Sequence, residues 1–146
     1  MKQNGMTIII KTIARLITGM IFLFGVYIIS HGHLTPGGGF AGGVIIAGCF
    51  ILLFISFGSE ETKSEIKKWH ASLAESLGIF FFWLLAMLGL FGGSYFFINV
   101  LAKGEPFHLF SAGIIPLCNV GIGIEVGAAL FGLFLTLVLL KMEKKK

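Results

Sequence analysis

Charged side chains are scarce in this sequence, and two long segments contain none at all. Only 12% of its 146 residues are Asp, Glu, Lys or Arg, whereas soluble domains have about a quarter. None of these residues occurs in 16–59 or in 76–102, 56% of the chain is hydrophobic, and the mean hydropathy is +0.97. About 20 apolar residues are enough for a helix to cross a bilayer. The composition therefore excludes a soluble domain and indicates an integral membrane protein.

The sequence also has little that would support catalysis. Its two cysteines, Cys49 and Cys118, each lie inside a hydrophobic run, and no CxxC or Cys/His spacing indicates a zinc site. We interpret both as small buried apolar residues. No nucleophile–base pair is visible either. We expect no catalytic chemistry, no bound metal and no cofactor in this chain.

The net charge of +4 does not indicate a nucleic-acid partner. The basic residues lie at the ends of apolar segments, where they would face lipid headgroups, rather than along one polar face. We therefore expect the lipid bilayer, and no nucleic acid, around this chain.

The hydrophobic runs predict an all-α integral membrane protein with four transmembrane helices, at about 7–30, 38–57, 77–101 and 116–140. They must be helices because lipid offers the backbone no hydrogen-bond partners. Between the second and third spans we expect a short interfacial amphipathic helix, since Ile66, Trp69 and Leu73 recur at helical spacing beside lysines. His70 shares that segment, and we interpret it as a surface histidine.

The distribution of Lys and Arg predicts the orientation. If the N-terminus is cytoplasmic, every Lys and Arg except Lys103 lies on the cytoplasmic side. Such an excess is typical of cytoplasmic loops. We therefore expect a multi-pass protein of the cell (plasma) membrane with cytoplasmic N- and C-termini.

The stretch "SHGHLTPGGGFAGG", residues 30–43, interrupts the apolar runs and allows three interpretations. Gly37, Gly39 and Gly42 match the dinucleotide fingerprint GxGxxG, but membrane-length runs flank them instead of a soluble βαβ unit. In a second interpretation, His31 and His33 bind a metal with His108 as a third ligand. The alternative is that these histidines hydrogen-bond to a loop or face water.

An architectural interpretation explains the glycines best. Gly39, Gly43 and Ala47 form a stripe of small residues at i, i+4 and i+8, which lets another helix approach closely. Pro36 fixes φ, and the glycines after it permit backbone that other residues disfavour. We expect a tight turn that leads into a closely packed helix.

Glu125 is the most informative single residue because it lies about 10–13 Å inside the fourth span at 1.5 Å per residue. An acid at that depth usually faces the interior of a bundle or a hydrated path. It could exchange a proton, or it could be permanently protonated or paired with a neighbouring subunit. Asn119 precedes it by six residues, and Gly123 with Gly127 forms another small-residue pair.

Two segments together resemble a known family: "GHLTPGGGFAGGVI" near the first loop and "GIIPLCNVGIGIEVGAALFGLF" in the last span. They are similar to the MnhB domain, the B subunit of Mrp-type multisubunit Na+/H+ antiporters. The resemblance covers the four-span core, and it implies one MnhB-like membrane domain over 1–146. It also implies a small subunit that works only in a hetero-oligomer with other Mrp-type membrane subunits, with Na+ and H+ as the transported ions.

Two sets of residues have candidate roles, and the resemblance points to all of them except His108 and Gly123, which we single out from their positions in the sequence. The candidates for the ion path are Glu125, Asn119, His108 and His33. The structural motif comprises Pro36, Gly37, Gly38, Gly39, Phe40, Gly42, Gly43, Pro116, Gly123 and Gly127.

Related modules also occur in archaeal membrane-bound hydrogenases and sulfur-reducing complexes, which couple electron transfer to sodium pumping. The resemblance thus leaves two settings open: a free-standing antiporter, or a redox complex with peripheral hydrogenase or iron–sulfur subunits. Within either one, the chain could line an ion path or could be purely structural. An independent homo-oligomeric transporter is disfavoured, because four spans hold one buried acid and no internal repeat.

Overall fold

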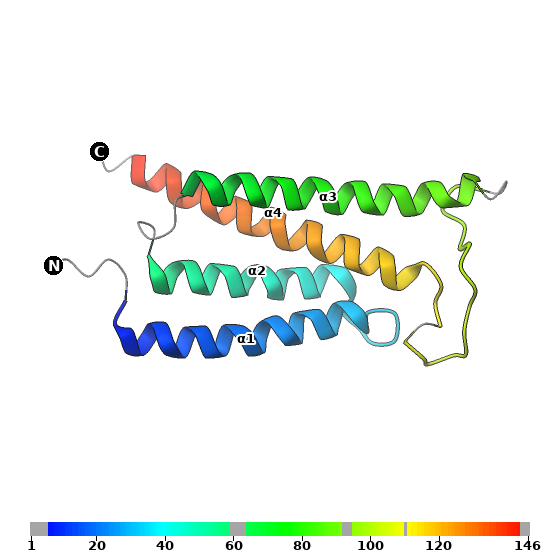
Figure 1. Ribbon diagram of the computed structural model, residues 1–146, viewed down its shortest axis with the longest axis horizontal. Helices are drawn as coiled ribbons and strands as arrows, with labels where there is room; N and C mark the ends of the chain where they lie inside the picture. The colour runs from blue at the N-terminus through cyan, green and yellow to red at the C-terminus, as the bar shows by residue number, and fades with distance from the viewer. Residues whose placement is uncertain (1–5, 59–63, 92–94, 110, 144–146) are drawn as a thin grey trace.

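The computed structural model describes residues 6–58, 64–91, 95–109 and 111–143, and it is built from four helices (Figure 1). They are α1 (Ile8–Ser30), α2 (Gly38–Phe57), α3 (Ser64–Phe91) and α4 (Ile115–Glu143). Each contains a segment that is long and apolar enough to cross a membrane. The predicted all-helical fold with four spans is confirmed.

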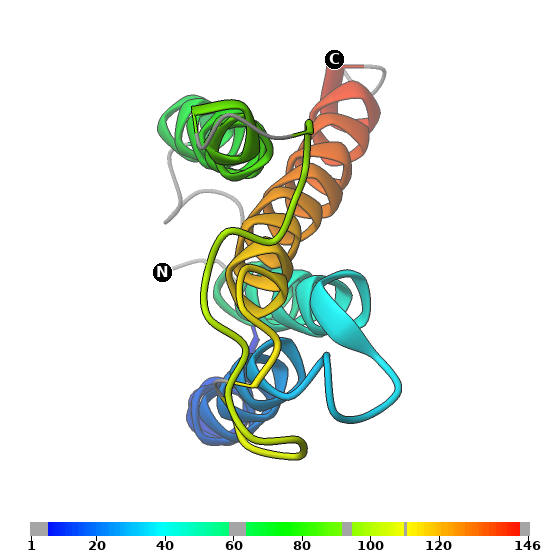
Figure 2. The same ribbon diagram turned by 90° about the vertical axis from the view of Figure 1, so that its right-hand side faces the viewer.

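The helices form an open row in the order α1, α2, α4, α3 rather than a closed bundle. α4 packs against both α2 and α3, whereas α1 packs mainly against α2 (Figure 2). Within the described residues, the backbone of α3 comes close to neither α1 nor α2. The beginning of α1 and the end of α4 lie at the same end of the row (Figure 1). The 31–37 loop and the connection between α3 and α4 lie at the opposite end, called here the outer end.

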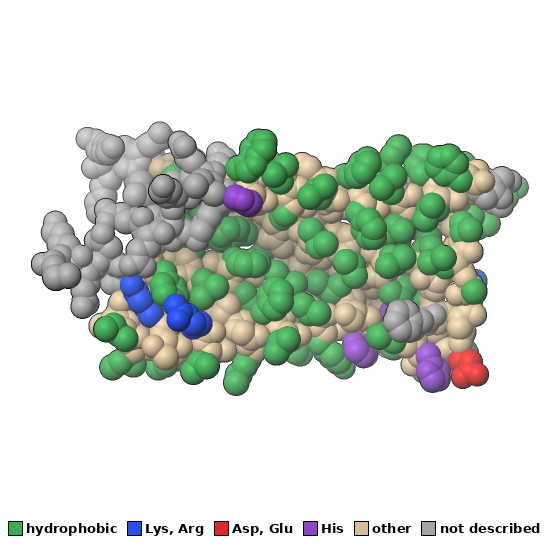
Figure 3. Space-filling model, viewed as in Figure 1, with side chains coloured by type: hydrophobic (Ala, Val, Ile, Leu, Met, Phe, Trp, Pro, Cys, Tyr) green, Lys and Arg blue, Asp and Glu red, His purple; other side chains and the backbone are tan. Residues whose placement is uncertain are grey.

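Large apolar side chains cover the outside of the row. Leu16, Met20 and Leu23 of α1, and Leu133 and Leu137 of α4, are all exposed. Figure 3 shows such side chains along the whole length of one face, with Lys and Arg gathered where α1 begins. Exposed apolar surface on this scale is typical of a protein whose helices face lipid or other membrane subunits.

The third span differs from its prediction at both ends. α3 begins at Ser64 and runs without a break to Phe91, so the predicted interfacial segment is the first part of the same helix. The part of α3 suited to cross the membrane is Trp69–Phe91, and residues 95–101, predicted as helix, are irregular. The sequence Gly92–Gly93–Ser94 explains the early end, because glycine is a poor helix former.

Asn99 holds the irregular segment in place. Its side-chain amide donates to the carbonyl of Ala112 at 3.0 Å, and its side-chain oxygen accepts from the backbone N–H of Ile114 at 3.0 Å. Phe97 packs its ring against Phe82 of α3 at 5.3 Å between centroids. The apolar residues after α3 therefore fold back along the outer end and join the first turn of α4.

Small residues bring the helices of the row together. A Cβ at Gly43 of α2 would lie 2.8 Å from the carbonyl oxygen of Gly123 and 2.9 Å from Cβ of Val126, both in α4. Ala47, one turn further along α2, is buried. The predicted stripe of Gly39, Gly43 and Ala47 thus faces α4, and no larger side chain fits at Gly43 without separating the helices.

Candidate functional site

The 31–37 loop folds tightly onto the end of α1. The carbonyl of His31 accepts hydrogen bonds from the backbone N–H groups of Leu34 at 2.8 Å and Thr35 at 2.9 Å. Gly37 and Gly38 then adopt φ values of 141° and 71°, which side chains disfavour. The predicted tight turn is present, and it delivers the chain directly into α2.

Asn119, in the second turn of α4, lies against this loop. A Cβ at Gly32 would lie 2.8 Å from Asn119 Nδ2, and a Cβ at Gly38 would lie 3.6 Å from its Oδ1. Gly39 packs directly on the Asn119 backbone carbonyl. Two motifs separated by about eighty residues of sequence therefore meet at the outer end of the α2–α4 contact.

Several polar atoms of the 31–37 loop and of Asn119 are buried without a partner among the described residues. They are Nδ1 and Nε2 of His33 and Nδ2 of Asn119. A buried polar group without a hydrogen bond costs about 1–3 kcal/mol, so such groups are rare without a role. We take His33, Asn119 and the loop glycines Gly32 and Gly38 as the candidate site and call them the outer polar cluster.

Glu125 is not part of the outer polar cluster. Six residues turn an α-helix by about 240°, at about 100° per residue, so Asn119 and Glu125 lie on different sides of α4. Glu125 backs onto α3, where a Cβ at Gly78 would lie 2.8 Å from its backbone nitrogen. Its side chain is half-buried and has no hydrogen bond or ion pair within the part of the chain that the structure describes.

The other two histidines of the sequence hypothesis lie apart from this cluster. His31 stacks on Tyr27 with 4.2 Å between ring centroids. His108 lies in the outer connection, where its Nε2 is 3.6 Å from a carboxylate oxygen of Glu105, and both side chains are largely exposed. In the described ranges no three His, Cys, Asp or Glu side chains gather as metal ligands. The structure thus brings Asn119 to the His33 loop but does not bring His108 there.

The remaining motif residues have structural surroundings. Phe40 is 65% exposed on the outside of α2. Pro116 occupies the first turn of α4. Backbone N–H groups there have no acceptor within the helix, so the missing N–H of proline costs no hydrogen bond. Gly42 packs against Ile29 and the Gly25 carbonyl of α1. The motif therefore serves two contacts of α2, one with each neighbour.

The sequence hypothesis missed two residues. Gly78 was not singled out, although its lack of a side chain is what admits the Glu125 backbone. Thr18 of α1 is buried with an unpartnered hydroxyl. The spacing of Ala14, Thr18, Gly25 and Ile29 along one helical face was the available signal for a buried Thr18.

Comparisons with known proteins agree with this geometry. The family model for a domain related to the MnhB subunit of Na+/H+ antiporters matches residues 9–132. An uncharacterized protein of Methanocaldococcus jannaschii is 37% identical over 144 residues, covering 94% of this chain and 53% of that protein. A Staphylococcus aureus protein named as antiporter subunit mnhB2 is 38% identical over 66 residues, covering 45% of each chain.

One solved structure is also similar. It is a chain of the membrane-bound sulfane sulfur reductase, an archaeal respiratory membrane complex, with 33% identity and a TM-score of 0.59. The match covers 91% of this chain and 60% of that one. The chain spans about half the length of the curated relatives that it matches.

The MnhB model names an antiporter subunit and no enzyme, in agreement with the expectation that the chain carries no catalytic chemistry. By this match over most of its length, the chain belongs to the family of MnhB-related membrane domains.

Proposed function

We propose that this chain is a membrane subunit of an Mrp-type cation/proton antiporter module within a hetero-oligomeric complex. Membership of the MnhB-related family supports the proposal, as does the S. aureus relative named for an antiporter subunit. Its partners are other Mrp-type membrane subunits, and Na+ and H+ are the ions moved. An open row with apolar surface on all sides fits a subunit that neighbours complete.

We infer further that the outer polar cluster borders the ion route. The observation that carries this inference is the set of buried polar atoms of His33 and Asn119 that have no hydrogen-bond partner in the part of the chain that the structure describes. Irregular backbone at membrane depth is tolerated where it is buried in protein or lines a hydrated cavity. Carboxamide and backbone carbonyl oxygens are ligands suited to hard cations, and a histidine can hold or release a proton near neutral pH.

Glu125 is proposed as a separate proton-exchanging group on the α3 side of α4. An ionisable residue inside a span is costly and usually faces a bundle interior or water with a partner. The close contact of the Glu125 backbone with Gly78 fixes where that carboxyl leaves the helix. Because Asn119 lies on another side of α4, the two groups act on different segments of the route or on different ions.

Antiport by the purified complex in vesicles tests this function. Proton release on Na+ addition is followed with a pH-sensitive dye, and assembly is checked on a native gel. Loss of exchange in Glu125→Gln with an intact complex supports the ion role. Normal exchange in both Glu125→Gln and Asn119→Ala would contradict it and leave a structural subunit.

The second candidate is an Mrp-like sodium-translocating module of a redox-driven membrane complex, in which this chain has a purely structural role. The similarity to a chain of the sulfane sulfur reductase favours it. It predicts that iron–sulfur or nickel-containing proteins purify with the chain and that Glu125→Gln leaves turnover unchanged. The free-standing antiporter predicts neither result.

The orientation remains part of the proposal. The beginning of α1 and the end of α4 lie at the same end of the row (Figure 1), where Lys11, Arg15 and Lys141 also lie. We propose that this end is cytoplasmic in the cell membrane, following the excess of basic residues. Labelling of single cysteines at positions 6 and 103 with a membrane-impermeant reagent in intact cells tests it, with reaction expected at 103 alone.

A further inference from the structure

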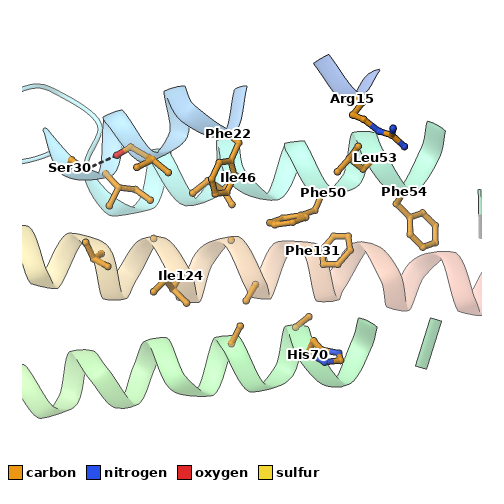
Figure 4. Close-up of a pocket in the computed structure, with 18 of the residues that line it drawn as sticks. Arg15, Phe22, Ser30, Ile46, Phe50, Leu53, Phe54, His70, Ile124 and Phe131 are labelled. Carbon is orange, nitrogen blue, oxygen red and sulfur yellow. Dashed lines mark hydrogen bonds between the residues drawn. The ribbon is translucent and has the colours of Figure 1, made fainter. Parts of the chain in front are cut away.

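A long groove opens on one face of the row, and the function proposed above does not use it. Its volume is about 980 Å³, and all four helices contribute to its walls (Figure 4). The floor follows α4 from Val120 to Phe131, with Gly123, Gly127 and Ala128 between them. Phe22 and Val26 of α1 and Ile46 and Phe50 of α2 form one wall, and Ala71 and Ala74 of α3 form part of the other.

The groove is apolar along most of its length and cationic at one end. Arg15 and His70 lie at the end where α1 begins, on opposite walls, whereas Ser30 lies at the far end (Figure 4). The Ser30 hydroxyl already donates to the Val26 carbonyl at 2.9 Å. Within the described residues, no Asp or Glu lines the groove.

The cationic end is reinforced by a second basic residue. The guanidinium carbon of Arg15 lies 5.2 Å from the centre of the Phe57 ring, and Nζ of Lys11 lies 5.4 Å from the same centre. Phe57 thus holds two cations beside the mouth of the groove. An arginine beside a hydrophobic groove matches a phosphate in both charge and hydrogen-bond geometry.

The dimensions of the groove fit acyl chains. The eleven steps from Val120 to Phe131 span about 17 Å at 1.5 Å per residue, against about 15 Å for half of a bilayer's hydrocarbon core. A lipid with a phosphate at one end and apolar chains matches both features of the groove: Arg15 lies at one end, and no other Asp, Glu, Lys or Arg of the described residues lines the rest.

We propose that this groove binds a phospholipid with an anionic headgroup, with its phosphate at Arg15 and its acyl chains along α4. The lipid fills the space that the open row leaves between α3 and the α1–α2 pair, and so supports the packing of α3, whose backbone comes close to α4 alone among the other described helices. The proposal does not depend on which ion the complex moves.

Photo-crosslinking of the assembled complex tests the proposal. Phosphatidylglycerol and phosphatidylcholine carrying the same diazirine on the acyl chain are supplied in separate samples, and the labelled peptides are mapped by mass spectrometry. We expect phosphatidylglycerol to label peptides containing Phe50 and Phe131 about five-fold more than phosphatidylcholine does, the preference that one cation near an anionic headgroup gives. The variant R15Q should remove this preference.

Two further variants sharpen the test. Lys141→Gln removes a cation from the same end of the row but outside the groove, and it should leave the preference unchanged. Ala128→Phe should fill the floor and reduce labelling by both lipids. Equal labelling by the two lipids in the unmodified complex would overturn the proposal, even if R15Q failed to assemble. A photo-reactive residue at position 50 that crosslinks to a neighbouring subunit instead of lipid would also overturn it.

Discussion

The two faces of α4 that pack against α2 and α3 carry different features. Toward α2, α4 presents Asn119, Gly123 and Gly127, and the two backbones come so close that only glycine fits at Gly43. Toward α3, it presents the backbone of Glu125, received by Gly78. The first face joins the glycine turn to polar atoms that have no partner among the described residues, while the second combines a close contact with a single acid. The comparison indicates that α4, which packs on both α2 and α3, is the central helix of the row, and that Asn119 and Glu125 lie at two separate places on it.

The largest expected effect comes from obstructing the first face. The variant G43L places a side chain against the Gly123 carbonyl and Val126. Overpacking costs about 1–3 kcal/mol, and more where the obstacle is backbone. We expect the complex to fail to assemble on a native gel. The matched control is Gly48→Leu on the same helix, where an added Cβ meets nothing within 4 Å. Equal assembly of both variants would contradict the close α2–α4 contact.

The next largest effect should come from the second face. Glu125→Gln keeps the shape of the side chain but cannot exchange a proton, so we expect Na+/H+ exchange in vesicles to be abolished while assembly remains normal. The variant E125D, which shortens the side chain and keeps the carboxyl, serves as its control and should retain part of the exchange. Full exchange by the glutamine variant would show that the carboxyl is structural.

A smaller effect is expected at the outer polar cluster. Removing the carboxamide in Asn119→Ala should lower the exchange rate about ten- to hundred-fold, because a contact with a charged group is worth about 1.5–3 kcal/mol. The stability of the complex should fall little, since the Asn119 amide nitrogen has no partner to lose among the described residues. A large loss of thermal stability with unchanged exchange kinetics would instead make Asn119 a packing residue.

The smallest effect is expected at His108. Its side chain is 72% exposed and its ion-pair partner Glu105 is 88% exposed, and such pairs contribute about 0–1 kcal/mol. His108→Ala should therefore change exchange by less than about two-fold, as for an ordinary surface pair. A loss as large as that of Asn119→Ala would bring the outer connection into the ion route.

The sequence predicted the helices well where the hydrophobic runs have clear limits. α2 occupies the predicted range 38–57, because the glycine turn before it and Gly58 after it both interrupt the helix. α3 was misplaced because its apolar run continues past Gly92 and Gly93 into residues that fold back. Hydropathy indicates which segments can lie in lipid but not whether they are helical. The irregular segment depends on the hydrogen bonds of Asn99 to residues more than ten positions away.

The candidate site was only partly predictable. The glycine turn and its conformation follow from residue types, since φ values such as those of Gly37 and Gly38 favour glycine. The meeting of Asn119 with Gly32 and Gly38 is a tertiary contact between distant segments, and no local pattern contains it. The separation of Asn119 from Glu125 was available in principle, because six residues never return to the same side of an α-helix.

The measurement that tests the central claim most directly is the composition of the complex that holds this chain in its native membrane. The membranes are solubilised in mild detergent, and every protein that purifies with the chain is identified by mass spectrometry. A subunit of this family that functions within an assembly should emerge with several other antiporter-type membrane proteins in constant proportion. A chain that emerges alone, or only with copies of itself, and exchanges Na+ for H+ when reconstituted by itself would contradict the account.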